Sequence, residues 1–326
     1  MKIQGNRFLI VGGFGLIASH IASQLIEKDA NEILLFDNGS VGQATSISSL
    51  INHPKIRIIQ GDVLRIENLM DACKNINGIF YTAAFITIPL SKRPVLGMDV
   101  NVKGLINTLE ASRLCNVKKI IYASSIAAFG NQESGTVDEK TSYHGYGVAP
   151  VSALYGIAKL MGEQLCALYG ENHGIEWMSL RLSSVYGERQ HTRGVNVIPM
   201  VEAHQKVRAG LPLEFAYNPI EVHDYIYAGD AARANLLAME KNFTGEIITI
   251  ATGVPTSLET LIETVLEACG SKDKPKFISD KNRLKSAGAT INSFNIGKAK
   301  LLLNWKPEIS FPNGIKKLVQ WLDRQK

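Results

Sequence analysis

At 326 residues, with 45% hydrophobic and 20% charged residues, the chain has the composition of a folded globular protein, which excludes disorder over any long stretch. Its 35 Lys and Arg against 30 Asp and Glu give a net charge of +5. No basic block is long enough to follow a phosphate backbone, so nucleic acid is not an expected partner. The mild excess indicates no more than a small bias toward an anionic ligand.

The four cysteines are scattered, without a Cys-x-x-Cys pair or a His at metal-ligand spacing. They predict free thiols in a reducing compartment and no bound metal. Residues 8–26 carry no charge and have roughly the length of a membrane span, but the glycines, Ser19, His20 and Gln24 among them argue against one. A signal-peptide pattern is also lacking, so we expect a cytoplasmic protein without membrane contact.

Strand patterns alternate with helical patterns along the chain, which predicts βαβ units and a doubly wound α/β fold of the Rossmann type around a parallel sheet. Helices are expected from about Leu16 and over residues 102–114, 153–169 and 313–321. Buried strands are expected at residues 8–11, 32–36, 56–59, 79–81, 120–123, 177–182 and 247–250.

After Tyr186 the sequence becomes richer in Pro and in short elements. This change predicts a smaller, discontinuous α/β lobe for substrate binding, made of residues 187–222 and 253–326. The larger domain then comprises residues 1–186 and 223–252.

A Gly-rich turn directly follows the first strand and opens a helix. Gly12 permits a tight turn, Gly15 lets a pyrophosphate approach the backbone, and the small Ala18 keeps helix and strand close. Asp37 ends the next strand, where a carboxylate hydrogen-bonds an adenosine ribose and repels a 2′-phosphate, so NAD is favoured over NADP. A turn that binds no ligand is the alternative, weakened because strand, helix and Asp37 stand in register.

Two further strand ends carry candidate cofactor contacts, because ligands of open α/β sheets bind at the carboxyl ends of the strands. Asp62 follows the third strand, and there it either contacts adenine or caps a helix. Ala83 and Ala84 follow the fourth strand and are small enough to let a cofactor lie close.

Tyr155 is the tyrosine that has a Lys four residues later, at Lys159. On a helix this spacing places both side chains on one face, and a nearby ammonium favours the phenolate, which predicts a general acid/base with a lowered pKa. Such a pair is common by chance and is often structural. Here the strand ending at Ser124 and Ser125 brings hydroxyls to the same crevice, where a Ser can hydrogen-bond a reacting oxygen.

Together these features resemble the NAD-dependent epimerase/dehydratase family of extended short-chain dehydrogenases/reductases, over nearly the whole chain. The resemblance rests on Gly12-x-x-Gly15-x-x-Ala18, Asp37, Gly61-Asp62-Val63, Asn101-Val102-Lys103-Gly104, Ala123-Ser124-Ser125 with Phe129-Gly130, Tyr155-x-x-x-Lys159, Arg181 to Tyr186-Gly187, His223-Asp224-Tyr225 and Asp230.

The resemblance implies bound NAD, Tyr155 as catalytic acid/base, Lys159 at the nicotinamide ribose and Ser125 as the active-site hydroxyl. The expected cofactor contacts are Gly12, Phe14, Gly15, Leu16, Ile17, Asp37, Asn38, Asp62, Val63, Ala83, Ala84, Asn101, Tyr155, Lys159 and Val185. The expected substrate contacts are Ser124, Ser125, Ser184, Arg189, His223 and Lys285.

The chain also departs from the family. Dehydratases carry an Asp-Glu pair where Ile126-Ala127 stands here, which argues against dehydration. Three positions that hold the substrate diphosphate in nucleotide-sugar epimerases are Ser184, His223 and Lys285 in this chain, and His and Lys grip phosphate less well than Arg.

Basic residues near the altered positions offer two interpretations. Arg189, His191 and Arg193 follow Gly187, and they either compensate for the missing phosphate contacts or are solvated loop residues.

Three functions remain open at this point. The first is epimerisation of a sugar, with a nucleotide-linked sugar favoured, through a keto intermediate with no net redox change. The second is an NAD-dependent dehydrogenase or ketoreductase of a non-nucleotide alcohol or carbonyl compound. The third, an NAD(H) sensor, is disfavoured by the complete Ser, Tyr and Lys set. Surplus apolar positions on the helices at 102–114 and 153–169, which the family often pairs between subunits, predict a homodimer.

Overall fold

The computed structural model describes residues 1–42, 44–132, 135–191, 194–278 and 293–325. A seven-stranded sheet, ordered β11-β7-β5-β4-β1-β2-β3, lies at its centre, and all neighbouring strands are parallel. The strand order reverses between β1 and β4, where such sheets form a ligand crevice. The strands are β1 (Arg7–Val11), β2 (Glu32–Asp37), β3 (Ile56–Gln60), β4 (Gly78–Tyr81), β5 (Lys119–Ser125), β7 (Glu176–Leu182) and β11 (Glu246–Ile250).

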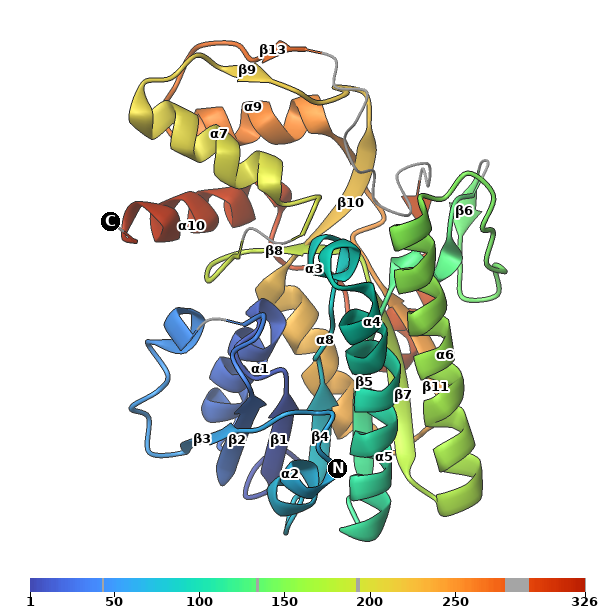
Figure 1. The fold of residues 1–326 in the computed structure, drawn as a ribbon. Coiled ribbons are helices and arrows are strands. Elements are labelled where there is room, and N and C mark those ends of the chain that lie inside the picture. Colours follow the sequence, from blue (N-terminus) through green and yellow to red (C-terminus); the bar gives the residue numbers. More distant parts are fainter. Residues whose placement is uncertain (43, 133–134, 192–193, 279–292, 326) are drawn as a thin grey trace.

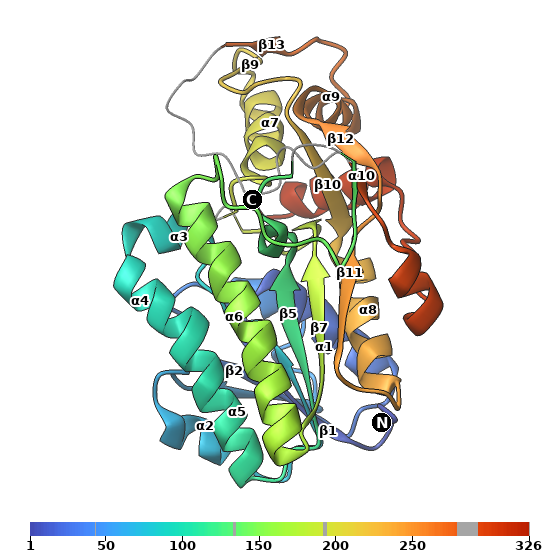
Figure 2. The ribbon, with the colours of Figure 1, turned by 90° about the vertical axis from the view of Figure 1, so that its right-hand side faces the viewer.

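Helices cover both faces of this sheet (Figures 1 and 2), so the expected doubly wound α/β fold is confirmed. One face carries α1 (Leu16–Glu27) and α8 (Ala228–Glu240), and the other carries α2 (Ile66–Ala72), α5 (Gly104–Leu114) and α6 (Pro150–His173). Each helix forms where apolar residues recur on one side, and burial of that side against the sheet stabilises it.

Short elements connect these layers. A turn of π-helix, η2 (Asp99–Lys103), leads directly into α5, so the helix expected from residue 102 begins earlier than its sequence pattern indicates. The remaining short elements on this side are η1 (Ala44–Ile47), α3 (Thr87–Lys92), α4 (Pro94–Met98), η3 (Ile126–Phe129), β6 (Thr136–Val137) and β14 (Ser293–Phe294).

A smaller lobe lies above the carboxyl ends of the strands (Figure 1). Its helices pack around a separate apolar core that includes Met200, Leu261 and Ile315. The elements of this part of the chain are β8 (Ser184–Tyr186), α7 (Ile198–Ala209), β9 (Glu214–Phe215), β10 (Val222–Tyr227), β12 (Pro255–Ser257), α9 (Leu258–Ala268), β13 (Lys276–Phe277), η4 (Ala299–Leu303) and α10 (Phe311–Asp323).

Two segments connect the lobe with the larger domain more closely than the predicted boundaries indicate. In β10, Ile226 packs into the core beneath the sheet, whereas Tyr225 and Tyr227 pack into the lobe. The turn η4 and the fully buried Trp305 also belong to the core of the larger domain, where the Trp305 Nε1–H donates to the Asp230 carbonyl at 3.0 Å. The division at residues 187, 223 and 253 stays a prediction.

The helices within the described ranges include none that is both long and apolar enough to cross a lipid bilayer.

Helix α6 lies unusually close to β5 because two of its glycines face the sheet side. A Cβ at Gly162 would lie 2.2 Å from the Tyr122 hydroxyl oxygen, and one at Gly156 would lie 2.2 Å from the Ala127 carbonyl oxygen. Tyr122 is 1% exposed and cannot turn away. The missing Cβ atoms therefore set the distance between α6 and the end of β5.

We expect Gly162→Ala to lower the free energy of unfolding by ~1–3 kcal/mol, because overpacking outweighs the gain in helix propensity. Urea unfolding followed by circular dichroism measures the change. Gln164→Ala, at an exposed position of the same helix, is the matched control and should leave stability nearly unchanged. Equal stability of the two variants would show that α6 has room to move.

Candidate active site

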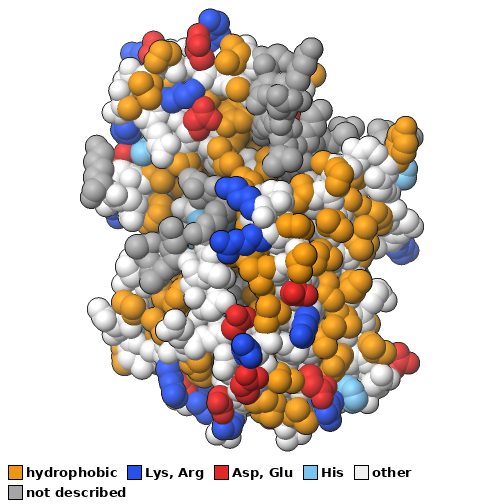
Figure 3. All heavy atoms as spheres, viewed as in Figure 1, with side chains coloured by type: hydrophobic (Ala, Val, Ile, Leu, Met, Phe, Trp, Pro, Cys, Tyr) orange, Lys and Arg blue, Asp and Glu red, His pale blue; other side chains and the backbone are white. Residues whose placement is uncertain are grey.

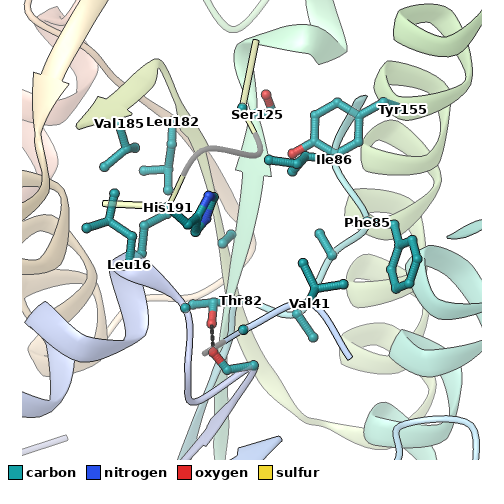
Figure 4. A pocket seen from close by; sticks show the side chains of 18 of the residues that line it. Leu16, Val41, Thr82, Phe85, Ile86, Ser125, Tyr155, Leu182, Val185 and His191 are labelled. Atoms are coloured by element: carbon teal, nitrogen blue, oxygen red, sulfur yellow. Dashed lines mark hydrogen bonds between the residues drawn. The ribbon is translucent and has the colours of Figure 1, made fainter. Parts of the chain in front are cut away.

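A cavity of about 310 Å³ opens at the carboxyl ends of the central strands, between the Gly-rich turn and α6. Figure 4 shows Ser125 and Tyr155 at one side of this cavity, with Leu182, Val185 and His191 across from them. Polar groups line it at both ends, with Asp37 and Asn38 beside β2 and Tyr155 and Lys159 on α6.

The turn after β1 has the geometry expected for a phosphate cradle. Gly12 adopts φ +85°, and a Cβ there would lie 2.7 Å from the Ala83 nitrogen, so only glycine fits. Gly15 is the N-cap of α1, and no side chain caps that helix. The N–H groups of its first turn therefore remain available to an anion, which the positive end of the helix dipole also favours.

Asp37 ends β2 beside this turn and lines the cavity. Its carboxylate accepts hydrogen bonds from the backbone N–H groups of Phe14, at 3.0 Å, and Gly39, at 2.8 Å. These bonds hold the carboxylate at the cavity wall. The turn, the helix end and the fixed carboxylate fit a dinucleotide.

Twelve of the fifteen expected cofactor contacts line the cavity, and Phe14, Asp62 and Asn101 do not. The Asp62 carboxylate accepts from the Leu64 N–H at 2.9 Å, so it closes a local turn. Those that line the cavity are Gly12, Gly15, Leu16, Ile17, Asp37, Asn38, Val63, Ala83, Ala84, Tyr155, Lys159 and Val185.

Asn101 does not line the cavity but bonds to a residue that does, Phe85. Its buried amide accepts from the Phe85 N–H at 2.7 Å and donates to the Phe85 carbonyl at 3.0 Å. The amide therefore shapes the loop after β4, which lines the cavity. A direct contact of Asp62, Asn101 or Phe14 with a cofactor stays a prediction.

The three residues predicted to be catalytic, Ser125, Tyr155 and Lys159, converge in this cavity. Ser125 ends β5, and its side chain lies on the same side of the cavity as that of Tyr155 on α6. The Ser125 Oγ also accepts from the Ala127 N–H at 3.1 Å. One turn further along α6, Lys159 donates from Nζ to the Ala123 carbonyl at 2.7 Å.

The acid/base properties differ from the sequence expectation. Burial raises the pKa of Tyr155 to about 12, and the neighbouring Ser125 side chain opposes that rise. Lys159 does not reverse it, because its ammonium is bonded to Ala123 and lies 5.6 Å from the centroid of the Tyr155 ring. Burial also lowers the pKa of Lys159 to about 8.

On the opposite side of the cavity, Ser184 and His191 line the wall, and the Ser184 Oγ accepts from the Asn196 Nδ2 at 2.7 Å. Ser124 reaches the lining too, but its hydroxyl donates to Glu163 Oε1 at 2.6 Å. A substrate contact through that hydroxyl would have to compete with the carboxylate.

Two expected substrate contacts lie outside the cavity lining. The Arg189 guanidinium donates to the Ser19 carbonyl at 2.8 Å and to the Ser23 hydroxyl at 3.1 Å, which ties it to α1. His223 is buried and hydrogen-bonded to Glu221 at 2.7 Å. Both side chains are therefore committed within the protein. Lys285 and Arg193 lie outside the described residues.

Several residues that line the cavity were not predicted from the sequence. Thr82, Phe85 and Ile86 follow β4, so the same strand-end rule that selected Ala83 and Ala84 could have found them. The others belong to connections without a motif, where only the folded chain shows which side faces the cavity. They include Val41, Gly42, Ser183, Gln190, Asn196 and Val197, and Leu182 at the end of β7 lines the cavity as well.

A Gly-rich turn over a helix end, joined in one cavity to a Tyr–Lys pair and a strand-end Ser, defines a dinucleotide-dependent oxidoreductase of the Rossmann class. The comparisons agree with this class. Residues 8–251 match the model of the family described as "NAD dependent epimerase/dehydratase family".

Relatives cover nearly the full chain. A protein of Methanocaldococcus jannaschii, provisionally assigned as a UDP-glucose 4-epimerase, is 34% identical to this chain. The alignment covers 96% of this chain and 97% of that protein. The UDP-glucose 4-epimerase of Thermotoga maritima, solved with UDP-glucose, superposes with a TM-score of 0.85 at 26% identity, covering 98% of this chain and 99% of its own. That of Thermus thermophilus, solved with NAD, has a TM-score of 0.81 at 26% identity, covering 97% and 99%.

The chain belongs to the NAD-dependent epimerase/dehydratase family and is an NAD-dependent enzyme of the short-chain dehydrogenase/reductase type.

We expect Asp37→Ala to weaken NAD binding ~10-fold, because the carboxylate offers a charge-assisted hydrogen bond to the adenosine ribose. The preference for NAD over NADP should become smaller, because the carboxylate repels a 2′-phosphate and alanine does not. Calorimetric titration with each dinucleotide measures both effects. Asp71→Ala, an exposed carboxylate on α2, is the control. Unchanged affinity for both dinucleotides in the Asp37 variant would remove Asp37 from the cofactor site.

Proposed function

We propose that this enzyme epimerises a nucleotide-linked sugar at its C4 carbon through a keto intermediate, without net oxidation. One observation carries the proposal: Ser125, Tyr155 and Lys159 meet in the cavity that begins at the Gly12–Gly15 turn. The UDP-sugar 4-epimerases among its relatives support the choice of substrate class. A cytoplasmic location, expected from the scattered cysteines, stays part of this proposal.

The residues of the cavity supply proton transfer and orientation. The turn at Gly12 and Gly15, together with Asp37 and Lys159, would hold NAD, which would supply an acceptor and donor of hydride and a positive charge. Beside positive charge the Tyr155 phenol loses its proton more readily than in the ligand-free protein, where burial holds its pKa near 12. The Tyr155 oxygen then takes the proton of a sugar hydroxyl and later returns it, while the Ser125 hydroxyl donates to the same sugar oxygen.

The surroundings of this set favour epimerisation over dehydration. A 4,6-dehydration needs a further acid/base pair beside the active-site hydroxyl. Ile126 and Ala127 occupy that place, and both are buried apolar residues. They can neither donate nor accept a proton, so a keto sugar formed here has no described group at this place to promote loss of water.

A net dehydrogenase of a smaller, non-nucleotide alcohol is the second candidate. Among the described residues, Lys159 and His191 are the basic side chains of the cavity lining, and Arg189 and His223 are engaged elsewhere. A diphosphate would therefore meet few cations in the described part of the chain, which favours this alternative.

A single assay with the purified protein separates the candidates. The enzyme should convert UDP-glucose and UDP-galactose into each other, which chromatography measures. The absorbance at 340 nm should show no steady rise, because no NADH accumulates. Tyr155→Phe should reduce turnover by ~100-fold or more while NAD affinity stays within ~3-fold, since the ring remains and the proton-transfer group is lost. Absence of interconversion together with steady NADH formation from a polyol or hydroxy acid would favour the dehydrogenase.

We also propose that the protein is a homodimer that pairs α5 and α6 with the same helices of a second copy. Figure 3 shows hydrophobic side chains gathered on the side of the molecule that carries these helices. On α6, Leu154, Ile157, Met161 and Leu168 are 40–49% exposed, and their spacing places them along one stripe. A stripe of this kind on a helix already packed against a sheet indicates a protein partner.

We expect wild-type protein to sediment as a dimer at micromolar concentration and Ile157→Glu to shift it toward the monomer, because the dimer would bury the new charge unpaired. Leu211→Glu, at an apolar position of the smaller lobe that is 54% exposed, should remain dimeric. A monomeric wild-type protein would refute this interface.

A further inference from the structure

Three residues of α6 and three consecutive residues of β5 join at the floor of the cavity. Tyr155, Lys159 and Glu163 follow one another at intervals of four, so they share one face of the helix. All three lie against the strand end 123–125. Lys159 donates to the Ala123 carbonyl at 2.7 Å, Glu163 accepts from the Ser124 hydroxyl at 2.6 Å, and Tyr155 lies near Ser125 in the cavity lining.

Of these three residues of α6, Glu163 is the one that has no role in the proposed reaction. Its side chain is 0% exposed, and Arg181, the register partner of Ser124 on β7, donates to both carboxylate oxygens at 2.9 and 2.8 Å. The Arg181 guanidinium is in turn covered by the Phe129 ring at 4.5 Å. This two-point contact fixes the carboxylate in direction as well as position.

A buried ion pair is weak evidence for a contribution to stability, because well-packed apolar residues of similar size are often as stable in its place. Another consequence of the negative charge lies one helical turn away. Burial lowers the pKa of Lys159 to about 8, and the charge of Glu163 acts against that lowering. The titratable groups that face Lys159 are Tyr155, Glu163 and Cys166 on α6 and Tyr122 on β5, whose ring centroid lies 4.9 Å from Nζ.

We propose that Glu163 is a positioning residue: its buried carboxylate holds the end of β5 against α6 and supplies the negative charge that keeps Lys159 an ammonium. The catalytic part of this inference rests on the proposed function, since it assumes that Lys159 and Ser125 serve Tyr155. Without the carboxylate, Lys159 is neutral over more of the physiological pH range, and the strand end that carries Ser125 loses the hydrogen bond between Ser124 and α6.

The charge of Lys159 can be measured without any substrate. Protein labelled with carbon-13 at the lysine ε-carbon is titrated by NMR, and Lys159→Arg identifies the signal. We expect a midpoint near 8 in the wild type and about 1 unit lower in Glu163→Gln. Glu171→Gln, the same change at an exposed position of α6, is the matched control and should not move the midpoint.

Catalysis supplies a second readout. For the nucleotide sugar that the wild-type enzyme converts, Glu163→Gln should lower kcat ~10- to 100-fold and leave KM nearly unchanged. The pH profile of kcat should also move. Glu163→Asp keeps the carboxylate and should restore part of the rate. A loss of folded protein alone would lower the amount of active enzyme without moving the profile.

If Glu163→Gln does not fold, because Arg181 is left as an unpaired buried charge, the titration is repeated on Arg181→Met and on Glu163→Gln combined with Arg181→Met, since these two proteins differ only in the charge at residue 163. An unchanged Lys159 midpoint in the folded variant overturns the proposal. Failure of the wild type to act on any nucleotide sugar would contradict the proposed function but would leave the titration decisive for the role of Glu163.

Discussion

The close packing of α6 on the carboxyl end of β5 is the contact on which the rest of the site depends. Gly156 and Gly162 let the helix approach so closely that a methyl group would collide with Ala127 or Tyr122. At that distance the Lys159 ammonium reaches the carbonyl of β5, and the Tyr155 phenol reaches Ser125. A helix held further from the strand would carry the same residues without joining them into a site.

The two ends of the cavity depend on different kinds of structure. The cofactor end is built mainly from backbone groups. They are the turn at Gly12, which has a positive φ, the uncapped helix end at Gly15 and the two N–H groups that hold Asp37. At the substrate end, side chains from β5, α6, β8 and the smaller lobe contribute singly. The first end therefore has a compact sequence motif, whereas at the second only the Tyr155–Lys159 pair has one.

Much of the fold could be predicted because most of its sheet strands are short, largely buried and separated by amphipathic helices, which leaves a clear pattern along the chain. The Tyr155–Lys159 pair could be predicted for a similar reason, since helical spacing alone places both residues on one face. Arg189 and His223 show where this reasoning stops. Both are basic residues that were expected to bind phosphate, yet each side chain is hydrogen-bonded within the protein and neither lines the cavity.

Local spacing by itself determined the parallel sheet, the turn at Gly12, the acidic end of β2 and the pairing of Tyr155 with Lys159, because each depends on residues close together in the chain. Tertiary structure alone decided the environment of those groups. Burial raises the pKa of Tyr155, where the nearby lysine indicated a fall, and Glu163 meets Arg181 and Ser124 from separate elements. Desolvation and long-range ion pairing follow from packing, which no local pattern in the sequence records.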